Sequence, residues 1–158
     1  IVNEKFKRRI TMLTVNDMLS IALKIEGAGY SYYSKLAEKT TGKIKELFSH
    51  LADQERDHAS RFREMLKDIE NLPVTAEWED NVGYLKSYAE ISIFPKIESE
   101  EVPQNLNKAI SAAMEVEKDS IIFYGDLETF IPNSESLKKI IAEEKRHLID
   151  LVKLYGTV

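Results

Sequence analysis

The sequence is dominated by four long segments in which apolar residues recur at spacings of three and four. This spacing is that of one face of an α-helix, and no segment alternates apolar and polar residues as a half-buried strand would. Only six glycines and four prolines interrupt the 158 residues. The segments predicted to be helical are about residues 14–38, 43–70, 104–130 and 136–155, with a further short helix at about 84–91. The sequence therefore predicts an all-α protein.

The connections between these segments differ in length. Thr14 and Asp17 have the spacing of a capping box at the start of the first helix, and short turns at residues 40–42 and 132–133 separate the helices of each pair. A crossover at about residues 71–103, which contains three of the prolines, joins the two pairs. Two antiparallel hairpins around one long crossover are the connectivity of a ferritin-like four-helix bundle. We expect this bundle at residues 13–158, after an N-terminal tail at 1–12.

Composition excludes several classes of protein. The chain has no cysteine, so disulfides, thiolate-bound metals and thiol nucleophiles are excluded, and any metal must be held by oxygen and imidazole ligands. The net charge of −5 argues against nucleic-acid binding, and no apolar run approaches the roughly 18 residues of a membrane span. No apolar signal segment stands at the amino terminus, so we expect a soluble, cytoplasmic protein.

Each apolar stripe is interrupted near its middle by residues that rarely lie in a core. In the first helical segment the interruption is Glu26, and in the third it is Glu117. The second and fourth segments each carry a Glu-x-x-His motif, whose spacing puts both side chains on one helical face. These motifs are Glu55 with His58 and Glu144 with His147. All four helices are thus expected to direct carboxylates into the bundle.

The two halves of the chain align with one another without a gap. ALKIEGAGYSYY at residues 22–33 superposes on AMEVEKDSIIFY at 113–124, which pairs Glu26 with Glu117 and Tyr33 with Tyr124. QERDH at 54–58 matches EEKRH at 143–147. An internal repeat of two helical hairpins would place the polar residues around a pseudo-two-fold axis, so they are predicted to form one site.

Four carboxylates in an apolar bundle need compensation, because burying each charge unpaired costs on the order of several kcal/mol. Two divalent cations would supply it. Four glutamates and two neutral imidazoles are an oxygen-rich ligand set suited to iron or manganese, and their distribution over the helices is that of di-iron carboxylate bundles. The competing interpretations are that these charges are exposed, or that the bundle is purely structural and binds no metal.

Two aligned tyrosines lie two turns beyond the lone glutamates of their helices. Because helical side chains lean toward the amino terminus, the hydroxyls of Tyr33 and Tyr124 can approach the metal region. There each hydroxyl would orient a ligand carboxylate or donate to a bound oxygen species. Aromatic packing in the core is the alternative role for both residues.

Other residues near the motifs are interpreted from their size and helical angle. Gly29 and Ser120 align in the repeat and are both small, which either leaves room for a small oxidant or only lets helices approach closely. His50 is rotated by about 80° from the nearest motif histidine on an ideal helix, so we expect it at the surface or supporting a ligand. Helical angle places Glu115 and Glu143 away from the site, and both are expected to be solvated.

Three stretches of the chain resemble the rubrerythrin branch of the ferritin-like superfamily. They are LADQERDHASRF at 51–62, AMEVEKDSIIFY at 113–124 and AEEKRH at 142–147, and the resemblance extends over essentially the whole chain after residue 12. It implies a non-haem di-iron centre that reacts with hydrogen peroxide or dioxygen in oxidative-stress defence. The residues it implies as ligands of the two iron ions are Glu26, Glu55, His58, Glu117, Glu144 and His147.

The chain departs from that family's pattern in two ways. Rubrerythrins carry an additional glutamate three positions after the lone ligand of the third helix, where this chain has Ser120, and that glutamate supports their peroxidase cycle. The chain also lacks the cysteines of a rubredoxin-like domain, so electrons are expected from an external donor protein. Ferroxidase activity with iron binding and storage is the alternative function. The resemblance further implies a homodimer, in which the long crossover could permit exchange of hairpins between chains.

Overall fold

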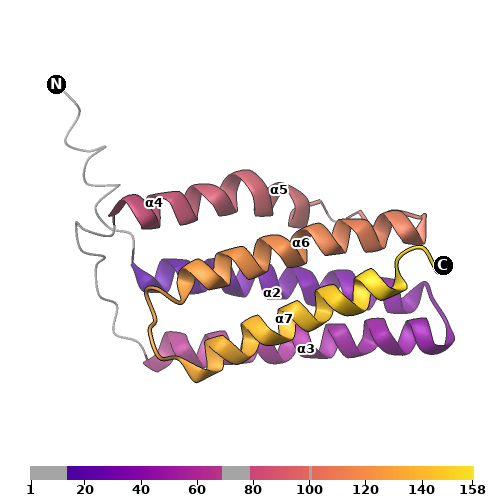
Figure 1. Ribbon diagram of the computed structural model, residues 1–158, viewed down its shortest axis with the longest axis horizontal. Coiled ribbons are helices and arrows are strands. Elements are labelled where there is room, and N and C mark those ends of the chain that lie inside the picture. The colour runs from indigo at the N-terminus through magenta and orange to yellow at the C-terminus, as the bar shows by residue number, and fades with distance from the viewer. Residues whose placement is uncertain (1–13, 69–78, 100) are drawn as a thin grey trace.

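The computed structural model describes residues 14–68, 79–99 and 101–158, and their regular structure is helical (Figure 1). In chain order the elements are α2 (Val15–Glu38), α3 (Gly42–Asp68), α4 (Glu79–Tyr88), the π-helical turn η2 (Ala89–Ile93), α5 (Phe94–Ile97), α6 (Leu106–Leu127) and α7 (Glu135–Leu154). Helix α2 packs mainly on α3 and α6 on α7, as two antiparallel hairpins, and the run from α4 to α5 lies along α6 (Figure 1). The predicted all-α four-helix bundle is confirmed.

Some sequence predictions lie outside the described residues. These are the N-terminal tail at 1–12, the last two residues of the second predicted helix at 69–70, and the first part of the crossover at 71–78. Within the described ranges, no helix combines the length and apolar character that crossing a membrane requires.

Side-chain caps mark where three of the four long helices begin. The Asp17 N–H donates to Thr14 Oγ1 over 3.2 Å and the Thr14 N–H donates to Asp17 Oδ2 over 2.7 Å, so the predicted capping box of α2 is present. Asn105 and Ser134 cap α6 and α7, each side chain accepting from the backbone N–H three residues on. The helix predicted to follow Pro103 directly therefore begins only after Asn105, because Asn105 supplies the side-chain acceptor.

The crossover is more helical than the sequence predicts. In place of a short helix at about 84–91, helical structure runs from residue 79 to residue 97 without a break. Pro95 does not end this run, and it lies in the first turn of α5, directly after the π-helical turn. The run is held to α6 by Tyr88 Oη, Ser92 Oγ and Lys96 Nζ, which all donate to the buried carboxylate of Asp119. We call these four residues the Asp119 anchor.

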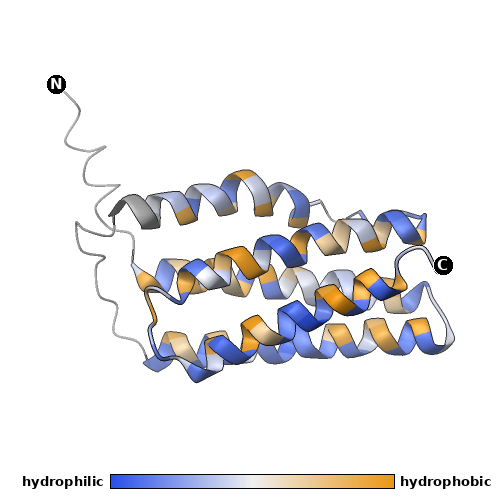
Figure 2. Ribbon diagram, viewed as in Figure 1, coloured by the Kyte–Doolittle hydropathy of each residue, from blue (hydrophilic) through white to orange (hydrophobic). Residues whose placement is uncertain are grey.

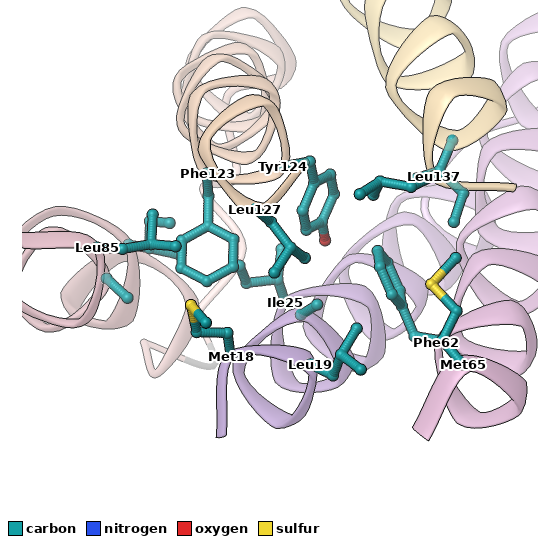
Figure 3. Close-up of a cluster of buried hydrophobic side chains, with 14 residues drawn as sticks. Met18, Leu19, Ile25, Phe62, Met65, Leu85, Phe123, Tyr124, Leu127 and Leu137 are labelled. Carbon is teal, nitrogen blue, oxygen red and sulfur yellow. The ribbon is translucent and has the colours of Figure 1, made fainter. Parts of the chain in front are cut away.

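Two clusters of buried apolar side chains fill the two ends of the bundle. The first includes Leu19, Phe62 and Leu127 and also draws on α4 and α7, as Figure 3 shows. The second includes Leu36 and Leu51. Hydrophobic and hydrophilic residues are interspersed along all four long helices, as an interior and an exterior face require (Figure 2). Each long helix contributes to one cluster before its middle and to the other after it, so the middle of each helix lies between the clusters.

Candidate metal centre

The middle of the bundle, between the two apolar clusters, is polar. Each long helix turns its apolar face inward on both sides of this level, and the same helical period carries the intervening glutamates and histidines inward. The residues gathered here are each at most 4% exposed and are Glu26, Glu55, His58, Glu117, Glu144 and His147. The structure thus brings together every residue of the predicted ligand set.

The potential ligand atoms form two groups that share two glutamates. One group is Glu26, Glu55, His58 and Glu144, and the other is Glu55, Glu117, Glu144 and His147. In each group, one ligand atom from every residue lies within 4.8 Å of the others. The glutamates of the two Glu-x-x-His motifs belong to both groups, whereas each lone glutamate belongs to one. These residues would hold two cations, with the two motif glutamates available to both.

Both histidines direct Nδ1 toward the glutamates. His58 Nδ1 lies 2.8 Å from Glu144 Oε1 and 3.4 Å from Glu26 Oε2. His147 Nδ1 lies 3.1 Å from Glu55 Oε1 and 3.2 Å from Glu144 Oε2. The centroids of the two rings are 5.6 Å apart. The carboxylate of Glu144 therefore contacts both imidazoles.

The electrostatics of the metal-free site favour proton uptake by the shared glutamates. Burial, together with the charges of Glu26 and Glu117, raises the pKa of Glu144 to about 8. Burial and the charge of Glu144 raise the pKa of Glu55 well above its ordinary value. Glu117 behaves differently, because the neighbouring imidazole of His147 and the hydrogen bond from Tyr33 outweigh its burial and lower its pKa.

Both imidazoles are also strongly proton-binding in the metal-free site. Burial disfavours a charge on His58, but the hydrogen bond with Glu144 and the nearby carboxylate of Glu26 outweigh it and raise the pKa of His58 to about 11. Glu117 and Glu144 likewise outweigh the burial of His147 and raise its pKa to about 10. Protons therefore balance the buried carboxylates near neutral pH. Cation binding by these residues must release protons.

Three buried atoms of this site have no hydrogen-bond partner among the described residues. They are Glu26 Oε2, Glu55 Oε1 and His147 Nδ1, whose contacts of 3.1 Å with one another or 3.4 Å with His58 lack the geometry of a hydrogen bond. Such unsatisfied atoms cost about 1–3 kcal/mol each and are rare in folded proteins. Carboxylate oxygen and imidazole nitrogen are ligands of iron and manganese, and the three residues lie in the two overlapping groups. The residues present therefore fit a pair of such cations.

Two tyrosines hold the lone glutamates from the opposite hairpin. Tyr33 Oη on α2 donates to Glu117 Oε1 on α6, and Tyr124 Oη on α6 donates to Glu26 Oε1 on α2. Figure 3 shows Tyr124 within the first apolar cluster, with its hydroxyl oxygen directed into the bundle. Burial and the contacted carboxylates raise the pKa of both tyrosines well above its ordinary value, so both hydroxyls keep their protons. Each tyrosine thus both packs in the core and orients a carboxylate.

The outer nitrogen of each histidine is also held from the opposite hairpin. His58 Nε2 lies 2.9 Å from Glu143 Oε2, and His147 Nε2 lies 2.9 Å from Gln54 Oε1. The prediction that Glu143 is solvated is wrong, because its long side chain reaches His58 and is only 24% exposed. Gln54 is a site residue that helical periodicity does not identify. The alignment of QERDH with EEKRH pairs it with Glu143 and is the signal that could have found it.

Two residues near the motifs lie outside the site. The side chain of His50 is exposed, so the interpretation as a surface residue is confirmed. The carboxylate of Glu115 pairs with Lys118 over 2.7 Å at the surface, which confirms its predicted solvation.

A cavity of about 510 Å³ opens beside the site, between α2, α6 and the segment around α5. Gly29, Glu55, Glu117 and Ser120 are part of its lining, so the cavity reaches two of the candidate ligands. A Cβ at Gly29 would lie 2.7 Å from Glu55 Oε2, so any residue other than glycine at this position would displace the carboxylate. The buried Ser120 hydroxyl donates to the Val116 carbonyl over 2.8 Å and offers the site no further carboxylate.

Fold and site together define a class of protein. Two helical hairpins that enclose two Glu-x-x-His motifs and two lone glutamates, joined by a crossover, are a ferritin-like carboxylate bundle of the dinuclear type. The rubrerythrin family model matches residues 17–155. The chain belongs to the rubrerythrin family, and the resemblance noted in the sequence is confirmed.

A solved structure supports the same class. The chain is similar to a protein from Thermotoga maritima that has been assigned to the ferritin-like diiron-carboxylate proteins. The two share 31% sequence identity with a TM-score of 0.72, over 93% of this chain and 98% of the other. No curated protein sequence matches the chain. The clustered glutamates and histidines accordingly form a candidate iron-binding site.

Proposed function

We propose that this protein is a non-haem di-iron oxidoreductase that reduces hydrogen peroxide or dioxygen with electrons from an external donor. The observation that carries the proposal is the pair of interlocked ligand groups, which contain unsatisfied buried atoms and lie beside a cavity. Bound iron would supply the electrons that reduce the oxidant and the positive charge that stabilises the reduced oxygen. The remaining steps depend on residues of the chain.

The six ligands divide according to the two groups. Glu26 and His58 would hold one iron and Glu117 and His147 the other, with the two motif glutamates shared between them. Each histidine presents Nδ1, because Nε2 is engaged by a residue of the opposite hairpin. Tyr124 occupies Oε1 of Glu26 and leaves Oε2 of that carboxylate for the metal.

The cavity supplies a route for a small oxidant. Its volume of about 510 Å³ far exceeds the roughly 30 Å³ that a water molecule occupies in the liquid, so hydrogen peroxide or dioxygen can enter. Gly29 and Ser120 keep side chains out of the approach to Glu55 and Glu117. The apolar clusters cover the site toward both ends of the bundle and exclude water there.

We further propose a separate protein as the electron donor and a homodimer as the working form. The chain has no cysteine with which to ligate an iron–sulfur or rubredoxin-type centre of its own. Exposed apolar side chains on α6 and α7, Ile122, Ile149 and Val152, favour contact with a second copy. Sedimentation that shows only monomer at micromolar concentration would contradict the dimer.

The proposed activity is tested by anaerobic loading with ferrous iron, followed by stopped-flow mixing with hydrogen peroxide and, separately, with dioxygen. We expect two irons per chain and a change in the near-ultraviolet absorption of the iron centre with at least one oxidant. Glu55→Gln, which alters a shared ligand, is expected to abolish the change, whereas Glu135→Gln, at an exposed carboxylate of α7 that does not line the cavity, serves as the matched control. A loaded protein whose spectrum responds to neither oxidant would refute the redox function.

The same preparation distinguishes the alternative function. Ferroxidase activity with storage predicts many irons retained per chain and a large assembly in light scattering. Two irons per chain in a small assembly count against storage and for the oxidoreductase.

A further inference from the structure

The two ligand groups differ in the residue that holds the outer nitrogen of their histidine. His58 Nε2 contacts a carboxylate, that of Glu143, whereas His147 Nε2 contacts an amide, that of Gln54. We propose that this difference makes the position of Glu26 and His58 the tighter of the two metal positions, so that a cation binds there first. Glu143 and Gln54 are the positioning residues that set this order. The inference rests on the proposed metal binding.

The difference is conspicuous because the two halves of the site match in their ligand types and in the residues that hold the lone glutamates. Gln54 and Glu143 occupy equivalent places in the repeat, each directly before the shared glutamate of its motif. Each reaches across to the other hairpin, and both contacts measure 2.9 Å. Each lone glutamate likewise receives one tyrosine hydroxyl, so the tyrosines do not distinguish the positions. The chemical contrast between the halves is therefore carboxylate against amide.

A carboxylate and an amide act differently on the imidazole they hold. An ionised carboxylate only accepts hydrogen bonds, so Glu143 fixes the proton of His58 on Nε2 and leaves the Nδ1 lone pair facing the site. The amide of Gln54 does so only while its oxygen, and not its nitrogen, faces His147. A hydrogen bond to an ionised acceptor is also about twice as strong as a neutral one, and it raises the basicity of the ligating nitrogen.

The surroundings of Glu143 keep this carboxylate in place. Arg61 Nη1 lies 3.3 Å from Glu143 Oε2, and Lys139 Nζ lies 4.0 Å from Glu143 Oε1. Arg61 also pairs with Asp57 over 2.7 Å, so carboxylates and cations are balanced in this surface cluster. The effect on His58 therefore comes through its hydrogen bond to Glu143 and not through an excess of negative charge.

The chain offers an exact exchange of the two groups as a test. Crystals of the wild type and of the double variant Gln54→Glu with Glu143→Gln are soaked anaerobically with one equivalent of cobalt(II), and anomalous scattering gives the occupancy of each position. In the wild type we expect more cobalt at the position of Glu26 and His58. In the double variant the preference is expected to reverse, toward Glu117 and His147.

Solution titration gives a second measurement that does not depend on crystals. Cobalt(II) binding, followed by visible absorption, should show two steps in the wild type, and Glu143→Gln alone should weaken the first by about tenfold, as is typical for partners of metal-binding histidines. Gln54→Glu alone should strengthen the second step. Thermal unfolding of each metal-free variant verifies that it is folded.

The outcomes separate this inference from the proposed function. Equal occupancy in the wild type, or a preference that the double variant does not reverse, overturns the inference about binding order. If two cobalt ions still bind in that case, the proposed metal site is supported. Protein that binds no cobalt at all overturns both.

Discussion

Buried carboxylates occur in two places within the described residues, and their hydrogen bonds are satisfied to different extents. In the Asp119 anchor both carboxylate oxygens are used, Oδ1 by Tyr88 over 2.6 Å and Oδ2 by Ser92 and Lys96. The candidate metal centre instead gathers four carboxylates around two imidazoles and two tyrosine hydroxyls. Within the described residues it leaves three buried atoms without a hydrogen-bond partner.

The difference in hydrogen-bond satisfaction indicates that the Asp119 anchor serves the fold and that the metal centre serves ligand binding. A buried carboxylate that serves the fold receives its donors from the chain, as Asp119 does from the crossover. A group of carboxylates with too few donors reduces stability until a cation or protons arrive. The anchor is therefore complete in the chain itself, and the metal centre is not.

Metal binding is expected to have the largest effect. At a thousandfold excess of free ferrous iron over its dissociation constant, one site adds about 4 kcal/mol to the free energy of unfolding. Glu144→Gln alters a residue common to both groups and should lose most of this gain, whereas Asp119→Asn should keep it. Anaerobic thermal unfolding with and without metal measures the gain. If iron does not change the melting temperature of the wild type, the metal centre does not need a cation to complete it, which contradicts the difference from the Asp119 anchor.

Weakening the Asp119 anchor is expected to have the next largest effect. Asp119→Asn removes the charge that Lys96 and Tyr88 contact and should lower the free energy of unfolding by about 2 kcal/mol. The loss should be the same in the metal-free and metal-loaded protein, as measured by urea unfolding. Lys96→Met should cost less, because that side chain is 38% exposed. A loss confined to the loaded protein would show that the anchor serves the site.

The metal centre should make the metal-free protein less stable as pH rises. The pKa of Glu144 is raised from 4.5 to about 8 in the folded protein, so the folded state holds a proton that the unfolded state has released. The stability from this group is full below about pH 4.5 and is lost as pH rises through 8. His147, with a pKa raised to about 10, acts in the same direction above its ordinary value.

We expect the free energy of unfolding of the metal-free protein to fall steadily between about pH 5 and 8, as determined from urea midpoints. Glu144→Gln should flatten the dependence, whereas Asp119→Asn should leave its slope unchanged. A metal-free wild type that gains stability over this range would show that protons do not balance the buried carboxylates.

The tyrosines should contribute less, and each to its own position. Tyr124→Phe removes the donor to Glu26 and Tyr33→Phe the donor to Glu117, at a cost of about 1 kcal/mol each. Tyr124→Phe is expected to weaken cobalt binding at the position of Glu26, and Tyr33→Phe at that of Glu117. Titration of the two variants side by side measures these effects. Identical effects on both positions would contradict the pairing of each tyrosine with the lone glutamate of the opposite hairpin.

The smallest effect is expected at the surface. Glu115→Gln removes an exposed carboxylate next to the site and should change the free energy of unfolding by less than about 0.5 kcal/mol. Metal stoichiometry should also be unchanged. A large effect would mean that charge outside the buried groups also determines metal binding.

The ligand set could be predicted from the sequence because each ligand is conspicuous where it stands. A glutamate in the middle of an apolar face, such as Glu26, is identified by helical period alone, and its recurrence as Glu117 in the repeat indicates a common site. The family resemblance rests on the same residues. The long helices were likewise predictable, because their apolar period and sparse glycines agree.

The remaining residues could not be predicted, because their roles depend on how the elements are arranged in space. Asp119 faces the crossover, and the helical periodicity of the sequence does not reveal where the crossover lies in space. The helical angle of Glu143 points away from the interior, yet its side chain is long enough to reach His58. The π-helical turn has no clear signal in AEISI, and it lies between Tyr88 and Lys96 of the anchor.

The contacts around the metal centre almost all join one hairpin to the other. Tyr33 and Gln54 of the first hairpin hold residues of the second, and Glu143 and Tyr124 of the second hold residues of the first. Metal bound at this centre would therefore act as a cross-link that closes a loop over most of the chain, which restricts the unfolded state as a disulfide does elsewhere. A chain without cysteine thus gains a removable cross-link, and either hairpin alone holds only half of it.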